Sequence, residues 1–384
     1  MFLWPYAYIS IAGVVGWFSA TYFSKRSADH FPVLKLKKDY FAGLNYLIND
    51  QTDKALDVFL KMIEIDDDTV EMHFALGGLY RRRGEIDRAI KIHSSLLDKE
   101  TLNNEQKHLA LTELALDYYR TGVFDRAEKL YLKILQSDSS DVNSMRYLMR
   151  IYEQEKDWIK AINLAERLQR KSGESQREII AFYYCELAQR YIRKDMMKAC
   201  QYYKQALAVK DDSARALLGL ADYHINNSEY EQAIDSYSKV MSNNMTYLPL
   251  VMDSIQQCYF MLNDKEGMRK FLWSAFKKKP TISVVLALVE YKQQYENDKA
   301  AIDFLIEHVR KYPTIYGLNY LVMFYLANSF GDLHQKLMIL KLFLDRIIES
   351  KDLYQCPQCG FSGKSFYWLC PGCKTWGVMR ILEE

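Results

Sequence analysis

The sequence predicts an all-α protein in which an α-solenoid follows one transmembrane helix and precedes a small tetracysteine metal domain. Three observations support this prediction. The first 24 residues carry no charged side chain, alanines recur at nearly constant intervals through the middle of the chain, and two Cys-x-x-Cys pairs stand near its end. With only 7 Pro and 16 Gly among 384 residues, the composition also favours long helices over many turns.

Residues 1–24 are predicted to form an uncleaved membrane anchor, since as a helix they are long enough to cross the hydrocarbon core of a bilayer. A cleaved signal peptide is the alternative. It would place basic residues before the apolar stretch, whereas Lys25 and Arg26 follow it. The positive-inside rule then predicts a periplasmic N-terminus, a basic juxtamembrane linker over residues 25–36 and a cytoplasmic remainder.

Residues 37–348 repeat one helical hairpin. In the clearest copy, residues 70–101, Leu76-Gly77, Tyr80, Gly84 and Ala89 stand where a tetratricopeptide unit has them. The alanine of the second helix recurs at spacings of 34, 38, 34, 38 and 34 residues, at Ala55, Ala89, Ala127, Ala161, Ala199 and Ala233. This period predicts a tetratricopeptide solenoid of about eight or nine hairpins, whose curved faces bind other proteins.

Other recurring residues of the solenoid are predicted to be structural. Tyrosines that recur eleven places into their units could suggest a cofactor site, but this spacing is typical of packing residues: Tyr80, Tyr118, Tyr152, Tyr191 and Tyr259. Gly84 and Gly122 fall between the two helices of a hairpin, where a left-handed backbone is useful. The isolated Cys185, Cys200 and Cys258 are predicted to be buried thiols in helix interfaces.

The four remaining cysteines, Cys356, Cys359, Cys370 and Cys373, form two Cys-x-x-Cys pairs in a segment too short for a core of its own, residues 354–384. Two such pairs in a reducing compartment favour a tetrathiolate metal site over two disulfides or four idle thiols. Zinc and iron both suit four sulfurs, so the metal stays open. Because the link to the last repeat is short, we expect this aromatic-rich segment to dock on the solenoid.

The inner face of the early repeats is a candidate partner-binding groove. Its predicted lining is aromatic and basic, which suits an acidic or amphipathic peptide: Phe74, Arg81, Arg82, Tyr119, Arg120, Arg146 and Arg150. The alternative is that these arginines belong to ordinary solvated helix faces.

Catalytic signatures are missing from the sequence. It has no glycine-rich phosphate loop, no Gly-x-Ser-x-Gly elbow and no His-Glu-x-x-His pair, so we expect a protein that is not an enzyme. The net charge of +2 implies no bulk attraction to nucleic acid.

The whole chain resembles the lipopolysaccharide assembly protein B family of Gram-negative bacteria. The most specific motifs lie in the terminal domain, Tyr354-Gln-Cys-Pro-Gln-Cys-Gly-Phe361 and Tyr367-Trp-Leu-Cys-Pro-Gly-Cys373 with Trp376. Weaker matches run along the rest of the chain: Gly16-Trp17, Asp39-Tyr40, Gly43-Leu44-Asn45, Arg83-Gly-Glu-Ile-Asp-Arg-Ala-Ile90 and Phe182-Tyr-Tyr-Cys-Glu-Leu-Ala188. The resemblance implies a rubredoxin-like terminal domain with Cys356, Cys359, Cys370 and Cys373 as metal ligands.

The resemblance also implies a role at the bacterial inner membrane. The family regulates lipopolysaccharide synthesis as an adaptor that helps a membrane-bound ATP-dependent zinc protease degrade the deacetylase of the lipid A pathway. A lipopolysaccharide-sensing inner-membrane protein is implied as an antagonist, and self-association stays open. Two alternatives are an assembly platform without a proteolytic role and a rubredoxin-like electron-transfer protein.

Overall fold

A computed structural model describes residues 40–46, 48–49, 51–65 and 70–382, except the side chains of 62–65. The chain divides into two compact units, Met1–Glu155 and Lys156–Glu384. The predicted anchor over residues 1–24 and the basic linker after it lie outside the described residues. Among the helices within the described ranges, none is both long and apolar enough to cross a membrane.

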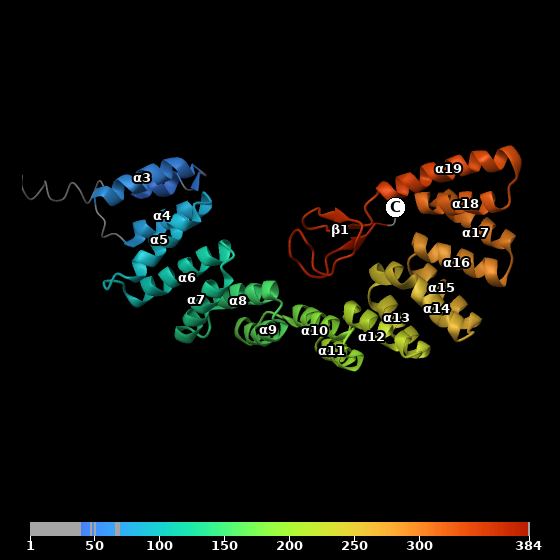
Figure 1. The fold of residues 1–384 in the computed structure, drawn as a ribbon, viewed down its shortest axis with the longest axis horizontal. Helices are drawn as coiled ribbons and strands as arrows, with labels where there is room; N and C mark the ends of the chain where they lie inside the picture. Colours follow the sequence, from blue (N-terminus) through green and yellow to red (C-terminus); the bar gives the residue numbers. More distant parts are fainter. Residues whose placement is uncertain (1–39, 47, 50, 66–69, 383–384) are drawn as a thin grey trace, which may run out of the picture. The chain divides into compact units, whose positions relative to one another are not determined.

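The described part of the first unit is a series of antiparallel helices (Figure 1). Residues 40–46 are helical and precede the first named helix. The helices that follow are α3 (Thr52–Ile65), α4 (Val70–Arg82), α5 (Ile86–Leu97), α6 (Asn104–Arg120), α7 (Phe124–Ser137) and α8 (Val142–Glu155).

The second unit continues the same alternation and ends in a small sheet. Its helices are α9 (Trp158–Ser172), α10 (Arg177–Tyr191), α11 (Met196–Val209), α12 (Ala214–Asn226), α13 (Tyr230–Asn243), the 3-10 helix η1 (Met245–Val251), α14 (Met252–Met261), α15 (Lys265–Lys278), α16 (Ile282–Tyr295), α17 (Asp298–Lys311), α18 (Ile315–Ala327) and α19 (Gly331–Ser350). The alternation of helices confirms the predicted all-α solenoid.

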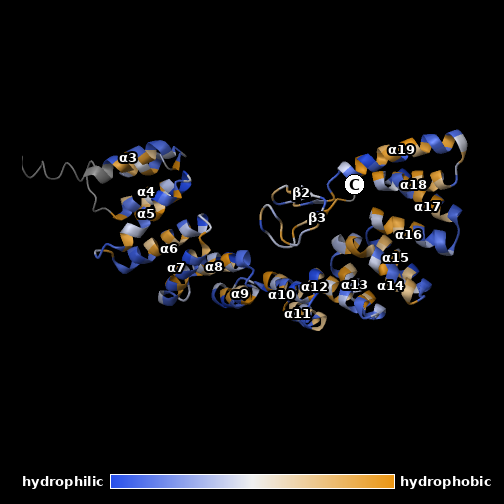
Figure 2. Ribbon diagram, viewed as in Figure 1, coloured by the Kyte–Doolittle hydropathy of each residue, from blue (hydrophilic) through white to orange (hydrophobic). Residues whose placement is uncertain are grey.

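Close helix packing explains the repeating alanines. All six have an exposed fraction of 0%, so a larger side chain would force the paired helices apart: Ala55, Ala89, Ala127, Ala161, Ala199 and Ala233. Apolar and polar residues alternate around most of these helices, as the hydropathy colouring shows (Figure 2). The apolar faces therefore meet between neighbouring helices and the polar faces meet solvent.

The turns follow local chemistry. Gly84 and Gly122 have φ of 81° and 76°, which confirms the left-handed backbone predicted there. Asn103 opens α6 with a capping box, since its side chain accepts from the Gln106 amide and the Gln106 side chain accepts from the Asn103 amide. The side chains of Asp157, Asp195 and Asp264 accept amide hydrogen bonds in the same way at the starts of α9, α11 and α15.

The isolated cysteines and recurring tyrosines pack as predicted. Cys185, Cys200 and Cys258 are buried, and burial raises the pKa of the Cys185 thiol to about 12. Of the five tyrosines, Tyr80, Tyr152 and Tyr259 are buried, and Tyr118 and Tyr191 are half-buried. The half-buried rings lie beneath basic side chains, with Arg126 over Tyr118 at 5.3 Å and Lys198 over Tyr191 at 4.2 Å.

A three-stranded antiparallel sheet follows α19. Its strands are β1 (Tyr354–Gln355), β2 (Ser362–Gly363) and β3 (Arg380–Ile381), in the order β2-β1-β3. Tyr354 pairs with Gly363 on one side and with Ile381 on the other. The sheet ties both ends of the terminal segment together, and two cysteine-bearing loops extend from it.

Candidate metal centre and its docking surface

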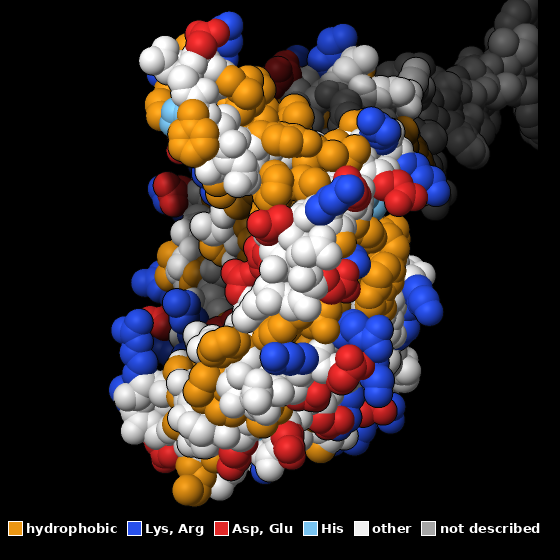
Figure 3. Space-filling model, turned by 90° about the vertical axis from the view of Figure 1, so that its right-hand side faces the viewer, with side chains coloured by type: hydrophobic (Ala, Val, Ile, Leu, Met, Phe, Trp, Pro, Cys, Tyr) orange, Lys and Arg blue, Asp and Glu red, His pale blue; other side chains and the backbone are white. Residues whose placement is uncertain are grey.

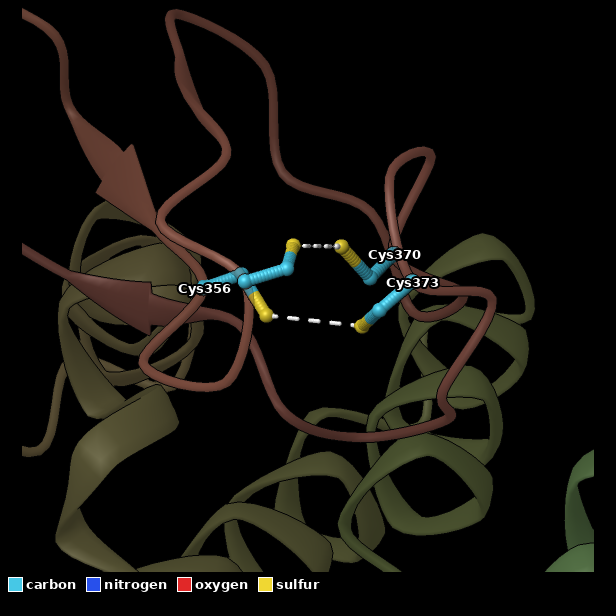
Figure 4. Close-up of side chains that lie close together, drawn as sticks. Cys356, Cys370 and Cys373 are labelled. Atoms are coloured by element: carbon cyan, nitrogen blue, oxygen red, sulfur yellow. Dashed lines mark hydrogen bonds between the residues drawn. The ribbon is translucent and has the colours of Figure 1, made fainter. Parts of the chain in front are cut away.

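The two Cys-x-x-Cys loops bring four thiols together (Figure 4). In each loop, the backbone amide of the residue four positions after the first cysteine donates a hydrogen bond to the carbonyl of that cysteine. The Gly360 amide donates to the Cys356 carbonyl, and the Lys374 amide donates to the Cys370 carbonyl. The residue after the second cysteine of each pair has a left-handed backbone, with φ of 76° at Gly360 and 56° at Lys374. Both loops thus have the same tight turn, which points their sulfurs toward one another.

The sulfur positions fit a tetrahedral metal ion. Cys356 Sγ lies 3.7 Å from Cys373 Sγ, Cys359 Sγ lies 3.6 Å from Cys370 Sγ, and all four lie within 4.8 Å of one another. A tetrahedral ion with metal–sulfur bonds of about 2.3 Å places its sulfurs roughly 3.8 Å apart. The separations are far longer than the roughly 2.05 Å of a disulfide bond. The geometry therefore supports the metal site and disfavours the two-disulfide alternative.

The thiols differ in how readily they ionise. Hydrogen bonding from the Thr375 side chain lowers the pKa of Cys373 to about 6, whereas burial raises the pKa of Cys370 to about 11. A bound cation stabilises every coordinating thiolate, so it would ionise the buried thiols as well. Zinc and iron both accept this donor set.

Four protein ligands define what the centre can do. A tetrathiolate site fills all four positions of a tetrahedral ion and leaves none for water or substrate. Cys356 and Cys370 are buried, Cys373 is half-buried and Cys359 is exposed. The arrangement therefore suits a structural ion, or one-electron transfer if the ion is iron, but not hydrolysis or Lewis-acid catalysis at the metal.

The metal ribbon, residues 354–382, docks on the helices of the second unit through two tryptophans. Trp376 stacks on Phe182 of α10, with ring centroids 5.2 Å apart, and its edge meets Tyr183 at 6.2 Å. It also lies 6.2 Å from Trp158 of α9. Only 9% of Trp376 is exposed, so this ring is buried in a pocket that the solenoid provides.

Trp368 makes the second anchor. Its ring lies 5.0 Å from Tyr247 of η1, and the Tyr247 hydroxyl donates to the Gly377 carbonyl at 3.2 Å. Arg215 of α12 lies over both indoles, 5.8 Å from Trp368 and 5.9 Å from Trp376, while it pairs with Glu186 at 2.8 Å. These contacts confirm the predicted docking of the tetracysteine segment on the solenoid.

The residues predicted to line the partner groove of the first unit differ in their burial and in their contacts. Arg81 pairs with Glu113 and, at 2.8 Å, with Asp117, whose other oxygen lies 2.5 Å from His93 Nδ1. Asp117 and His93 have exposed fractions of 0%. Arg81 therefore completes a buried polar network between α4, α5 and α6.

The other predicted lining residues of this groove divide by burial. Phe74 packs on His93, and Tyr119 packs on Tyr147 at 5.2 Å. Arg150 lies 5.8 Å from the Tyr147 ring. The exposed members are Arg82, Arg120 and Arg150, while Phe74, Tyr119 and Arg146 are half-buried. Partner binding by this surface stays a prediction.

Sequence reasoning missed the residues that receive the ribbon, Phe182, Arg215 and Tyr247. One signal was present, since Phe182 and Tyr183 open the Phe-Tyr-Tyr-Cys-Glu-Leu-Ala motif noted above, but the motif gave no role to either ring. Tyr247 lies on η1, a 3-10 helix that interrupts the helical alternation after Val240. Its position depends on the fold and could not be inferred from the repeat period.

The fold and the site together define a helical-repeat protein that carries a tetracysteine metal ribbon docked on its own repeats. A family model described as a rubredoxin metal binding domain matches residues 354–380, and a tetratricopeptide repeat model matches residues 195–243. The chain belongs to the lipopolysaccharide assembly protein B family. It is 31% identical over 380 residues to lipopolysaccharide assembly protein B of Escherichia coli strain K12, covering 98% of this chain and 97% of that protein.

A second relative carries the same name. The chain is 30% identical over 386 residues to the protein of the same name from Haemophilus influenzae strain Rd, covering 98% of this chain and 97% of that protein. Among solved structures, the crystal structure of MamA protein covers 47% of this chain and 94% of its own at 18% identity, with a TM-score of 0.36.

Proposed function

We propose that this protein acts in lipopolysaccharide assembly as a membrane-anchored, non-catalytic adaptor. It would bind the deacetylase that commits material to lipid A and deliver that enzyme, as a substrate, to a membrane-bound ATP-dependent zinc protease. The observation that carries the proposal is the full-length similarity to proteins named lipopolysaccharide assembly protein B, over 98% of the chain.

The parts of the chain fit such an adaptor. An anchor over residues 1–24 would hold it at the bacterial inner membrane with its repeats in the cytoplasm, where a protease and its substrate could share the same surface. Confinement of this kind raises effective concentration without any new contact. The exposed arginines of the first unit, Arg82, Arg120 and Arg150, would contact an acidic or amphipathic segment of a partner. A lipopolysaccharide-sensing membrane protein would oppose this activity.

The experiment that tests the proposal is depletion of this protein while the half-life of the deacetylase is followed after synthesis is blocked. We expect the half-life to lengthen severalfold on depletion and to return to its original value when the intact chain is restored. An unchanged half-life would reject the adaptor and leave the assembly platform, in which the protein gathers lipopolysaccharide enzymes without promoting degradation.

A second candidate function, electron transfer, depends on the metal ion at the four cysteines. Iron bound to four thiolates takes up one electron, so an iron protein would show a reversible absorbance change on reduction. Zinc in place of iron would make the purified protein colourless and redox-silent. Metal analysis of protein purified from its native host, together with a visible spectrum, distinguishes the two.

A further inference from the structure

The last helix of the solenoid carries an uncovered apolar surface. α19 packs on α18, yet Leu344 is the one buried side chain among its described residues. Large apolar side chains along its outer side are exposed by 41% at Leu340 to 88% at Phe330, just before the helix. We call six of them the terminal stripe: Phe330, Leu333, Ile339, Leu340, Phe343 and Ile347. Hydrophobic side chains gather over the end of the solenoid where α18 and α19 lie (Figure 3).

Most of the terminal stripe lies on one face of α19, with Lys336 between Leu333 and Leu340 on that face. Leu333, Leu340 and Ile347 are seven residues apart, and Phe343 falls three places after Leu340, so these side chains lie above one another along α19. The outer face of a terminal repeat is ordinarily polar, because no further repeat covers it. An apolar stripe at this position therefore needs a partner surface.

We propose that α19 pairs antiparallel with α19 of a second copy of this chain, forming a two-fold symmetric dimer. Leu340 stands midway between Leu333 and Ile347, seven residues from each. A two-fold axis near Leu340 therefore sets Leu333 of one copy against Ile347 of the second copy, and Leu340 against its own equivalent. A surface that matches itself in this way is what an isologous interface requires.

The charges of α19 favour the same arrangement. Asp332 stands in its first turn, where it pairs with Lys336 at 2.5 Å, and Arg346 stands near its end, so antiparallel pairing also brings Asp332 close to Arg346 of the second copy. Parallel pairing would instead set like charges and like helix dipoles side by side. The three acidic and three basic residues of α19 cancel, whereas a helix that lies on an anionic membrane is rich in Lys and Arg. A second copy therefore fits better than a lipid surface.

The apolar area approaches the area that each partner of a standard-size interface buries. From their exposed fractions, the six side chains of the terminal stripe offer on the order of 600 Å² per copy, against roughly 800 Å² per partner in a standard-size interface. Leu342, three residues after Ile339 and also exposed, extends the apolar surface toward that area.

The test uses the full chain in mild detergent, with molar mass measured by light scattering. We expect a dimer for the unaltered protein and a monomer for Leu340→Glu/Phe343→Glu, because the substitution places carboxylates on both sides of the axis. The matched control is Leu132→Glu/Phe260→Glu, which alters a leucine exposed by 41% on α7 and a phenylalanine exposed by 61% on α14. This control should remain a dimer, and circular dichroism should show that both variants are as helical as the unaltered chain.

A charge-pairing experiment tests the antiparallel axis itself. Leu340→Glu and Leu340→Lys should each dissociate tenfold or more readily than the unaltered protein, and an equimolar mixture of the two should recover dimers that contain one copy of each. A monomeric unaltered chain, a dimer unaffected by Leu340→Glu/Phe343→Glu, or no recovery in the mixture would each overturn the proposal. So would a monomeric chain whose terminal stripe instead binds phosphatidylglycerol vesicles and loses that binding in the double variant.

Discussion

Trp376 of the metal ribbon stacks on Phe182 of α10, with ring centroids 5.2 Å apart and ring planes within 19°. The two rings come from elements far apart in the chain, and both are buried. Because the ribbon is too short to hold a core alone, part of its core is supplied by α10. The folding of the metal centre and the packing of the middle repeats are therefore coupled through this pair.

Replacing Trp376 with alanine should release the ribbon. Truncating a buried Trp costs about 3–5 kcal/mol, and part of that cost falls on α10 because the Phe182 ring loses its cover. We expect the helical signal of the repeats to be lost at lower urea. The control is Tyr367→Ala, which removes a ring of the same ribbon that is 42% exposed. Equal urea midpoints for the two variants would show that the stacking carries no stability.

Loss of one metal ligand should be transmitted to the repeats. Cys356→Ser leaves three thiolates, so we expect less than one bound metal ion per chain and a lower melting temperature of the helices in the second unit. The comparison variant is Cys258→Ser, at a buried thiol of α14, which should keep its full metal content whatever it does to stability. Metal analysis with a thermal melt followed by circular dichroism checks both. A thermal melt unchanged by Cys356→Ser would show that the metal ribbon does not stabilise the repeats.

The periodic part of this protein could be predicted from the sequence because each repeat uses the same packing. Ala89 and Ala127 must be small wherever paired helices touch, and Gly84 and Gly122 must be permissive wherever the turn is left-handed. These are local requirements, so they recur at a fixed period. The metal ligands were predictable for a similar reason, since two Cys-x-x-Cys pairs specify their own geometry.

The docking surface could not be predicted, because its residues meet only through the fold. Arg215 resembles any other helix arginine in the sequence, yet it lies over two indoles of the ribbon. Arg81 was predicted as a groove residue from its position in α4, while its ion pairs with Glu113 and Asp117 depend on the neighbouring hairpin. Periodicity locates such residues on a helix but does not identify their partners.

Gly377 should tolerate no side chain, for two separate reasons. Its φ is 65°, and a Cβ there would lie 2.9 Å from Cζ of Phe182. Gly331 has almost the same φ, 66°, with open space around it. We expect Gly331→Ala to cost about 1–2 kcal/mol of backbone strain, and Gly377→Ala to cost more because the contact with Phe182 adds to it. Urea denaturation of the two variants checks the difference, and equal losses would mean that the Phe182 ring moves aside freely.

Arg81 and Arg120 should respond differently to truncation. Removing Arg81 leaves the Asp117 carboxylate buried beside His93 without its cationic partner, and breaking a buried ion pair in this way costs about 3–5 kcal/mol. Arg120 is exposed, so Arg120→Ala should change stability by less than about 0.5 kcal/mol. Denaturant unfolding of the two variants checks this. If Arg120→Ala weakens partner capture without lowering the free energy of unfolding, the result supports the predicted partner-binding groove. A loss of capture in Arg81→Ala does not support it, because that substitution disrupts the buried polar network with Asp117.

Ser228 offers a stabilising substitution in the turn between α12 and α13. Its φ is 59°, a left-handed backbone that strains a residue with a side chain by about 1–2 kcal/mol, whereas glycine adopts it freely. Glycine also loses more conformational entropy on folding, so Ser228→Gly should raise the free energy of unfolding by about 0.5–1 kcal/mol. The neighbouring Asn227, with φ of −95°, is the matched control. Asn227→Gly relieves no strain and should lower that free energy by about 0.5–1 kcal/mol. Urea unfolding should therefore move in opposite directions for the two adjacent substitutions, and a shared direction would contradict the assignment of strain to Ser228.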